Sequence, residues 1–301
     1  MKPAMSFIPV TRFRRPTAPW ALHWRDELPA PPARAWKALV DPADLAGWWC
    51  DSAQVEERSG GRYTFGGKHA YGGEASAEIT AWEPPSLLEF RWPLGGVDTT
   101  VRYELEESMD ETVIDVVQSA ASPPGNAPGP GMPSWWWVAI PALKSHLAKG
   151  KADLRIDWTA QADAFSVTVP VSTFPWIIWW KLTDPRELER WWARQAEVDP
   201  VPGGAFRLGL ESMGPETAIE VEPGRRLLHD WTWPGGNRTQ VEWTVETTDE
   251  DTLLGVRDLG PDPGSPNPGA PDPRPLYWGA HVLALKDMSE RGFSARDRSE
   301  R

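Results

Sequence analysis

Hydrophobic and polar residues alternate along the start of two long stretches of the chain. The alternation covers Ala21–Leu28 and again Phe165–Val171, and this spacing of two predicts half-buried strands. Later in each stretch the apolar positions change to helical spacing, over Ser134–Lys149 and over Leu276–Arg291. Each stretch is therefore expected to begin with a strand and to end with a helix.

Proline and glycine divide the first stretch into further elements. Pro31-Pro32 and Asp41-Pro42 are typical helix starts, since proline is tolerated in the first turn and aspartate is a good N-cap. Pairs of glycines or prolines then separate short alternating segments, which is the pattern of hairpin-linked antiparallel strands. The predicted helices are 33–40 and 41–49, and the predicted strands are 54–58, 62–65, 74–82, 87–92, 99–105 and 111–119.

The most informative feature is a repeat. Asp41–Trp49 reads Asp-Pro-Ala-Asp-Leu-Ala-Gly-Trp-Trp, and Asp184–Trp192, 143 residues further on, reads Asp-Pro-Arg-Glu-Leu-Glu-Arg-Trp-Trp. The period exceeds the roughly 20–50 residues of solenoid repeats and equals the size of a domain. Other landmarks recur at nearly the same offset: Gly60-Gly61 as Gly203-Gly204, Trp92-Pro93 as Trp233-Pro234, Tyr103 as Trp243, and Leu143-Lys144 as Leu285-Lys286.

The repeat predicts two homologous domains. The long loops before the closing helices, 122–133 and 260–275, are rich in proline and glycine and cannot join a sheet. The expected organisation is a flexible arm at 1–19, a first domain at 20–150, a linker at 151–162, a second domain at 163–292 and a charged tail at 293–301.

The net charge of the chain limits the classes of partner that it is expected to bind. A net charge of −12 and a pI near 5.0 argue against nucleic acid and anionic membranes, because both require a basic surface. Cys50 is the one cysteine, so no internal disulfide forms, and a small semi-buried side chain is expected there. No apolar run reaches the roughly 18 residues of a membrane span. The cytoplasm is the expected compartment.

The order of elements and the repeated motifs resemble the SRPBCC or START-like superfamily, which includes the birch-pollen-allergen fold. Within it they are most similar to the homologues of the heat-shock-protein-90 ATPase activator. That resemblance implies an α+β fold of two tandem helix-grip domains, each a curved antiparallel sheet wrapped around a long C-terminal helix. The residues that carry it are Asp41-Pro42, Leu45, Trp48-Trp49, Gly60-Gly61-Arg62-Tyr63, Glu83-Pro84, Trp136 and Leu143-Lys144, with their second copies Asp184-Pro185, Leu188, Trp191-Trp192, Gly203-Gly204-Ala205-Phe206, Glu222-Pro223, Trp278 and Leu285-Lys286.

The chain departs from that family in two respects. A member is usually a single domain, whereas this chain is a tandem, and the loops before the closing helices are unusually long. Two equal domains on one chain predict a monomer in which a pseudo-two-fold pair replaces a homodimer.

The space between sheet and helix is the candidate site. In this fold it is either a packed core or an apolar ligand cavity with a few polar groups, and the sequence leaves both open. The residues predicted to line it are Phe90, Trp92, Tyr103, Trp136 and Ile140 in the first domain, and Trp231, Trp233, Trp243, Trp278, His229 and His281 in the second.

Three polar residues stand at positions expected to face inward. His229 is matched with Leu88 of the first domain, and His281 lies three residues after Trp278, so the two imidazoles could meet as a ligand contact or a proton-transfer pair. The alternative is two unrelated histidines. Asp26 would contact a ligand, pair with an arginine, or lie where water reaches it, since burial without a partner is costly.

Three functions follow from this pattern. The leading hypothesis is a non-enzymatic binder of small hydrophobic molecules. The second is a protein-interaction module of the co-chaperone kind, which predicts filled cores and an exposed apolar or acidic patch. The third is a cyclase or hydrolase using His229 and His281. No metal or cofactor is expected, because the sequence has no ligand pair, phosphate loop or nucleophile turn.

Overall fold

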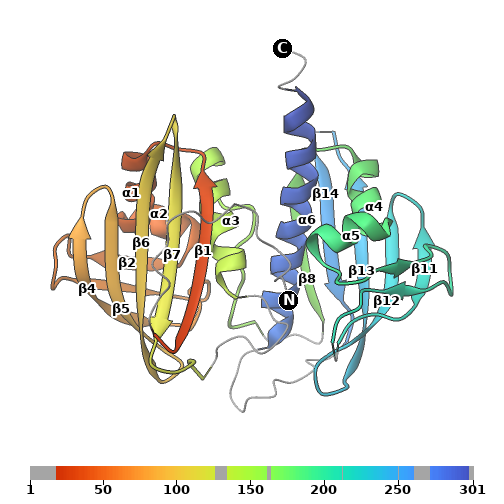
Figure 1. Cartoon of the computed structure of the whole chain (residues 1–301), viewed down its shortest axis with the longest axis horizontal. Helices are drawn as coiled ribbons and strands as arrows, with labels where there is room; N and C mark the ends of the chain where they lie inside the picture. Colours follow the sequence, from red (N-terminus) through yellow and green to blue (C-terminus); the bar gives the residue numbers. More distant parts are fainter. Residues whose placement is uncertain are drawn as a thin grey trace. The chain divides into compact units, whose positions relative to one another are not determined.

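The structure, a computed structural model, describes residues 18–125, 134–160, 164–211, 213–249, 251–260 and 272–297, with side chains to residue 291. Apart from these gaps, the residues form two compact units, 18–160 and 164–297 (Figure 1). The predicted tandem of α+β domains is confirmed. Parts of the predicted arm, loops and tail lie outside the described residues, at 1–17, 126–133, 261–271 and 298–301.

The first half contains the predicted elements in the predicted order. Strand β1 (Trp20–Leu28) leads to two short helices, α1 (Pro32–Val40) and α2 (Pro42–Trp48), and the half closes with α3 (Trp136–Lys149). Its antiparallel sheet has the strand order β1-β7-β6-β5-β4-β3-β2, a meander whose last strand returns beside the first. The intervening strands are β2 (Ser52–Val55), β3 (Arg62–Gly66), β4 (Ala75–Glu83), β5 (Leu87–Leu94), β6 (Val97–Ser108) and β7 (Glu111–Ala120).

The second half repeats this order with a less complete sheet. Five strands pair in the order β11-β12-β13-β14-β8, and a separate ladder joins two strands of two residues each. The expected continuous meander is therefore interrupted at β9 and β10. The elements are β8 (Phe165–Val171), α4 (Pro175–Thr183), α5 (Pro185–Trp191), β9 (Glu197–Val198), β10 (Phe206–Arg207), β11 (Ala218–Glu222), β12 (Arg226–Thr232), β13 (Arg238–Thr247), β14 (Thr252–Asp258) and α6 (Pro273–Asp297).

The repeated Gly-Gly turns show why this motif recurs. The first glycine of each pair adopts a positive φ, 73° at Gly60 and 80° at Gly203, which favours glycine. A Cβ on the second glycine would lie 2.2 Å from the carbonyl oxygen of Glu56 in one half, and a Cβ on Gly204 would lie 2.3 Å from that of Asp199 in the other. Any other residue would therefore force the backbone of either turn apart.

The strand register corrects one part of the predicted alignment of the two halves. Trp92 pairs with Thr99 across the β5–β6 hairpin, whereas Trp231 pairs with Thr239 across the β12–β13 hairpin. Trp92 therefore corresponds to Trp231 and not to Trp233, which is matched by Leu94. The Trp-Pro pair misleads because it stands two residues nearer the turn in the second half, and a shift of two keeps a side chain on the same face.

Two segments differ from the predicted boundaries. Helix α6 continues to Asp297, beyond the predicted end at Arg291. Residues 151–160, predicted as linker, lie within the first compact unit. The backbone N–H of Trp158 donates to the carbonyl of Lys68 at 2.8 Å, and the indole of the same residue donates to the carbonyl of His69 at 3.1 Å.

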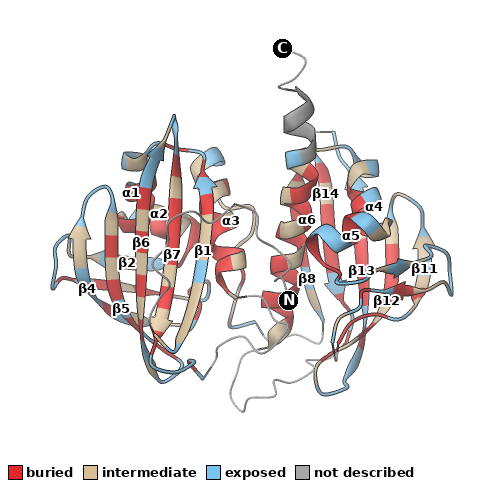
Figure 2. Ribbon diagram, viewed as in Figure 1, coloured by how far each residue is buried: buried red, intermediate tan, exposed pale blue. Residues whose placement is uncertain are grey.

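Burial follows the predicted alternation. On β5 and β6 the inward side chains are buried and their neighbours are wholly or partly exposed (Figure 2). Each closing helix packs on its own sheet, α3 against β1 and α6 against β8 and β14. Each half thus has a separate core between its sheet and its long helix, and these cores contain the candidate site residues.

Candidate functional site

The five predicted residues of the first half converge in its core. Phe90, Trp92 and Tyr103 from the sheet and Trp136 and Ile140 from α3 are each at most 3% exposed. The rings of Tyr103 and Trp136 meet edge to face with centroids 5.9 Å apart, and those of Phe90 and Tyr103 lie 6.0 Å apart. These are the separations of packed aromatic pairs.

The four predicted tryptophans of the second half also converge. Trp231, Trp233, Trp243 and Trp278 are at most 1% exposed. The ring of Trp278 contacts those of the other three, at centroid separations of 4.8 Å, 5.9 Å and 6.1 Å. One further ring, Trp192, contacts Trp231, Trp243 and Trp278 and completes the cluster.

The repeated Trp-Trp pair supplies this central ring in both halves. The first indole of each pair fixes the helix hairpin: Trp48 donates to the carbonyl of Ala38 at 2.9 Å, and Trp191 donates to that of Lys181 at 3.0 Å. The second indole enters the core, where Trp49 stacks on Trp136 at 5.7 Å. Trp49 and Trp192 are absent from the predicted lining. The signal that could have found them is their position at the end of the repeated nine-residue motif.

The two predicted histidines both contact Trp192 but not each other by a hydrogen bond. His229 lies 6.4 Å and His281 lies 5.3 Å from that ring, centroid to centroid. Nδ1–H of His229 donates to the carbonyl of Asp230 at 2.6 Å, and Nδ1–H of His281 donates to that of Tyr277 at 2.7 Å. Since a carbonyl only accepts, both tautomers are fixed with the proton on Nδ1.

Burial keeps both imidazoles neutral at physiological pH. Desolvation lowers the pKa of His229 to about 4, and it lowers the pKa of His281 to about 4 as well. The indole Nε1–H of Trp243 donates to Nε2 of His229 at 3.2 Å, so this fully buried ring has a partner on each nitrogen. In register, His229 corresponds to Phe90 of the first half and not to Leu88, as the sequence had suggested.

A polar group lies under the closing helix in each half. The indole of Trp136 donates to Oε1 of Gln118 at 3.1 Å in the first half, and that of Trp278 donates to Oδ2 of Asp258 at 3.0 Å in the second. Both acceptors are 0% exposed. Burial raises the pKa of Asp258 above its ordinary value, although three hydrogen bonds and the nearby Arg274 oppose that rise.

The inward Asp26 has a different partner from those predicted. Its Oδ1 accepts from Nζ of Lys144 on α3 at 2.8 Å and from the backbone N–H of Glu27 at 2.8 Å. The predicted arginine or ligand is replaced by a lysine of the same repeat motif. This ion pair joins β1 to the closing helix.

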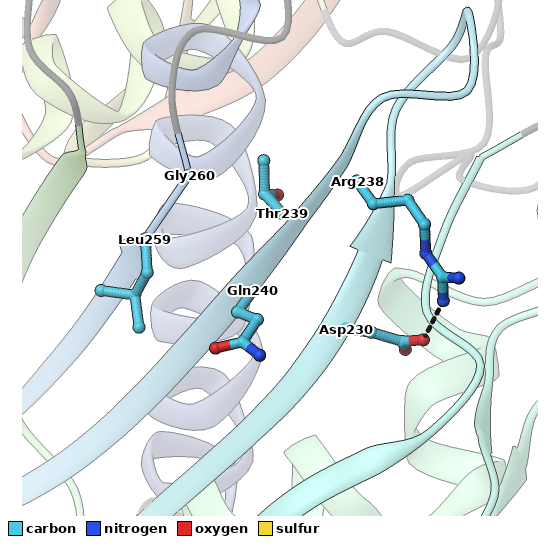
Figure 3. Close-up of a pocket in the computed structure, with 6 residues that line it drawn as sticks. All are labelled: Asp230, Arg238, Thr239, Gln240, Leu259 and Gly260. Atoms are coloured by element: carbon cyan, nitrogen blue, oxygen red, sulfur yellow. Dashed lines mark hydrogen bonds and ion pairs between the residues drawn. The ribbon is translucent and has the colours of Figure 1, made fainter.

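Some of the described residues line a pocket outside these cores. It has a volume of about 410 Å³ and lies on the outer face of β12 and β13, where Asp230 and Arg238 form an ion pair at 2.9 Å (Figure 3). None of the predicted site residues lines it. The lining residues are Asp230, Arg238, Thr239, Gln240, Leu259 and Gly260.

Neither metal nor thiol chemistry is supported by the described residues. No group of three or more His, Cys, Asp or Glu residues could hold a metal ion in that part of the chain. Cys50 is fully buried, and desolvation raises the pKa of its thiol to about 11, which leaves no reactive thiolate at neutral pH. No described helix is long and apolar enough to cross a membrane.

The largest exposed aromatic residues of the described chain gather on one helix. Phe174, which caps α4, is 55% exposed, Trp176 is 59% exposed and Trp180 is 45% exposed. We call these three residues the α4 surface. Sequence reasoning missed it, because tryptophan in a helix fits core packing equally well.

Comparisons with solved structures identify relatives of low similarity. DynU16, a protein in the dynemicin biosynthetic locus, is 19% identical over 90% of this chain and 98% of its own, with a TM-score of 0.38. CalU16 from Micromonospora echinospora is 27% identical over 34% of this chain and 61% of its own, with a TM-score of 0.30. The Aha1 dimer from Colwellia psychrerythraea is 19% identical over 44% of this chain and 99% of its own, with a TM-score of 0.36.

The family is shown by the sequence itself. No curated protein matches the chain. The family model described as Activator of Hsp90 ATPase homolog 1-like protein matches twice, over residues 29–148 and over residues 174–286. The two matches cover most of the chain, one in each half, as the repeat predicted. The chain therefore belongs to the Activator of Hsp90 ATPase homolog 1-like family, as a tandem of two domains.

Proposed function

We propose that this protein is a non-catalytic protein-interaction module of the co-chaperone kind. The observation that carries the proposal is that the chain's own aromatic side chains contact one another in both cores. The rings predicted to line a ligand cavity instead contact one another, with Trp49 at the centre of one cluster and Trp192 at the centre of the other. A filled core leaves the outer surface as the place where the protein acts.

Two further observations support this proposal. The ionisable groups in the second core are paired internally: each Nδ1–H of His229 and His281 reaches a backbone carbonyl, and Asp258 accepts three hydrogen bonds. Groups poised for proton transfer would face a substrate instead. In addition, the α4 surface exposes three large aromatic side chains, and exposed apolar patches mark interaction sites.

The family description points to the class of partner. We infer that the partner is a chaperone of the Hsp90 type and that binding stimulates its ATPase. The test is the steady-state ATPase rate of a purified Hsp90 chaperone from the same organism, measured with and without this chain. A concentration-dependent increase, together with a complex in light scattering, is expected. An unchanged rate and no complex at tens of micromolar would overturn the proposal.

One observation favours a small apolar ligand as the second candidate. The indole Nε1–H of Trp231 is buried in the second core and has no hydrogen-bond acceptor, and an unpaired buried donor costs about 1–3 kcal/mol. A ligand with an acceptor would satisfy it. Native mass spectrometry before and after denaturation decides: a released small molecule, absent from Trp231→Phe, would favour this candidate, and a clean mass would favour filled cores.

Two simpler proposals concern the oligomeric state and the location of the protein. We propose that the chain is a monomer, because two related domains are already joined, and light scattering at the mass of one chain is expected. A dimer would contradict it. We also propose a cytoplasmic location, because the one cysteine, Cys50, allows no internal disulfide. Fractionation of the native cells would test it.

A further inference from the structure

The exposed side of α4 is unusually apolar for a surface helix. The inward positions of this helix are already satisfied: Ile178 and Leu182 are fully buried, and buried Lys181 forms an ion pair with Glu187 of α5 at 2.9 Å. Trp176 and Trp180, one turn apart, therefore contribute exposed area beyond what anchors the helix. Their exposure is not needed for packing.

The matching helix of the first half shows that the fold does not require this surface. The offset between α1 and α4 is 143 residues. The two capping aspartates establish it, and so does the register of β1 on β7 compared with that of β8 on β14. At that offset Pro31 stands for Phe174, Ala33 for Trp176 and Lys37 for Trp180. Since α1 is a helix of the same length without the three aromatic residues, this helix forms in the fold without them.

The acidic side chains near α4 are already bonded within the chain. Glu290 of α6 accepts from the backbone N–H of Ser172 at 2.8 Å and from Nζ of Lys286. On α5, Glu187 is already bound by Lys181 and Arg190, and Glu189 accepts from the backbone N–H of Ala196 at 3.0 Å. Arg186 is exposed and has no ion pair among the residues that the structure describes. In a chain of net charge −12, α4 thus presents exposed indoles, and the next helix in the chain, α5, presents an exposed guanidinium.

We propose that the α4 surface, together with Arg186, binds an acidic segment of a partner protein that also carries apolar side chains. Tryptophan and arginine are the residues that dominate binding energy at protein interfaces, and both are exposed here. The proposal rests on the proposed function and names the surface and the chemistry by which that function is exercised.

A binding assay tests the proposal without the chaperone. The probe is a fluorescein-labelled amphipathic peptide of 14 residues built from leucine and glutamate, and fluorescence anisotropy reports its binding to the full chain. The double variant Trp176→Ala/Trp180→Ala is expected to weaken binding at least tenfold, and Arg186→Glu about threefold to tenfold. Lys37→Ala, at the matching position of α1, is the control and should change nothing.

A second probe separates charge from apolar contact. A peptide with lysine in place of every glutamate should bind at least tenfold more weakly, and higher salt should weaken the glutamate peptide. Equal binding of the two peptides, or binding that the tryptophan variants leave unchanged, would overturn the proposal. Acrylamide should quench wild-type fluorescence more than that of Trp176→Phe/Trp180→Phe; equal quenching would mean that the chain itself covers the surface, which also overturns it.

The remaining occupants are outcomes of the same experiments. Tryptophan-dependent partitioning onto phosphatidylcholine vesicles without peptide binding would assign the surface to lipid, and a dimer that the double variant dissolves would assign it to a second copy. Either result overturns the proposal. Peptide binding with no effect on chaperone ATPase would retain this surface and reject only the chaperone as partner.

Discussion

In each half a buried tryptophan of the closing helix donates to a buried side chain, but the acceptor is an amide in the first half and a carboxyl group in the second. In the first half Gln118 accepts from Trp136, and its own amide N–H donates to Oγ1 of Thr99 at 2.9 Å. The hydroxyl of Thr99 in turn donates to the carbonyl of Trp92 at 2.8 Å. In the second half Asp258 accepts from Trp278 and also from the hydroxyl of Thr239, at 3.2 Å. Thr99 thus accepts from Gln118, whereas Thr239 donates to Asp258.

The reversal follows from the properties of the two acceptors. A carboxylate only accepts, so Thr239 must donate to Asp258 and then needs a donor for its own oxygen. That donor is the indole of Trp233, at 3.2 Å, which stands where the first half has Leu94. The comparison shows that the fold accepts either a neutral or a charged core network, provided that each donor meets an acceptor.

The largest effect is expected when either acceptor is removed. Asp258→Ala leaves Trp278, Thr239 and the N–H of Gly260 without their acceptor and should lower the free energy of unfolding by about 3–5 kcal/mol. Gln118→Ala leaves mainly Trp136 unpaired, so about 1–3 kcal/mol is expected. Hydrogen exchange of the strands measures each half separately. Equal losses would mean that the two networks do not differ in energy.

His229 in the second core should make the free energy of unfolding depend on pH. Burial lowers the pKa of His229 from 6.5 to about 4, so the unfolded chain takes up a proton first as the pH falls. The contribution of His229 to the free energy of unfolding should therefore fall by about 3 kcal/mol between pH 6.5 and 4 and change little below that pH. His281, whose pKa is lowered to about 4 as well, should contribute a similar fall in both the wild type and the variant below.

The variant His229→Phe, which places the residue of the first half at this position, should remove that part of the pH dependence. Thermal unfolding of both proteins between pH 7 and 4 measures it. Parallel stability curves for the two proteins would contradict the assignment, because the other titrating groups are unchanged.

A smaller effect is expected where the halves differ at the helix hairpin. Gly47 of α2 faces His146 of α3, and a Cβ there would lie 2.6 Å from the Cε1 atom of that ring. The ring cannot easily turn away, because its Nε2–H donates to Asp44 at 2.7 Å. Gly47→Ala should cost about 1–3 kcal/mol in urea denaturation.

The second half supplies the control for this substitution. Arg190 stands at the position of Gly47, and Met288 stands at that of His146. Arg190→Ala removes a mostly exposed side chain and its ion pair with Glu187, which Lys181 still binds, and should change stability by no more than about 1 kcal/mol. A well-tolerated Gly47→Ala would show that the imidazole can move.

The smallest effects should be equal in the two halves. Asp41 accepts from two backbone N–H groups at the start of α2, and Asp184 does the same at the start of α5. Replacing either by alanine should cost about 1 kcal/mol, and asparagine should restore most of it. Denaturation curves compare them, and a clear inequality would mean that one helix start depends on other contacts.

Local signals made most of the architecture predictable. The caps at Asp41 and Asp184 and the Gly-Gly turns depend on neighbours within a few residues, so the repeat displayed them directly. Alternation with a period of two placed Phe90, Trp92 and Tyr103 on the inner face. It could not fix the alignment of Trp92 with Trp231, because a shift of two residues preserves the face.

What the sequence by itself determined is therefore the tandem, the order of elements and the residues that enter each core. Whether those residues line a cavity or fill it depends on contacts between elements far apart in the chain, such as Trp49 on Trp136. The same holds for the separation of His229 from His281 and for the pairing of Asp26 with Lys144. The exposure of Trp176 and Trp180 was also decided by the tertiary structure, because an apolar residue is buried only where another element covers it.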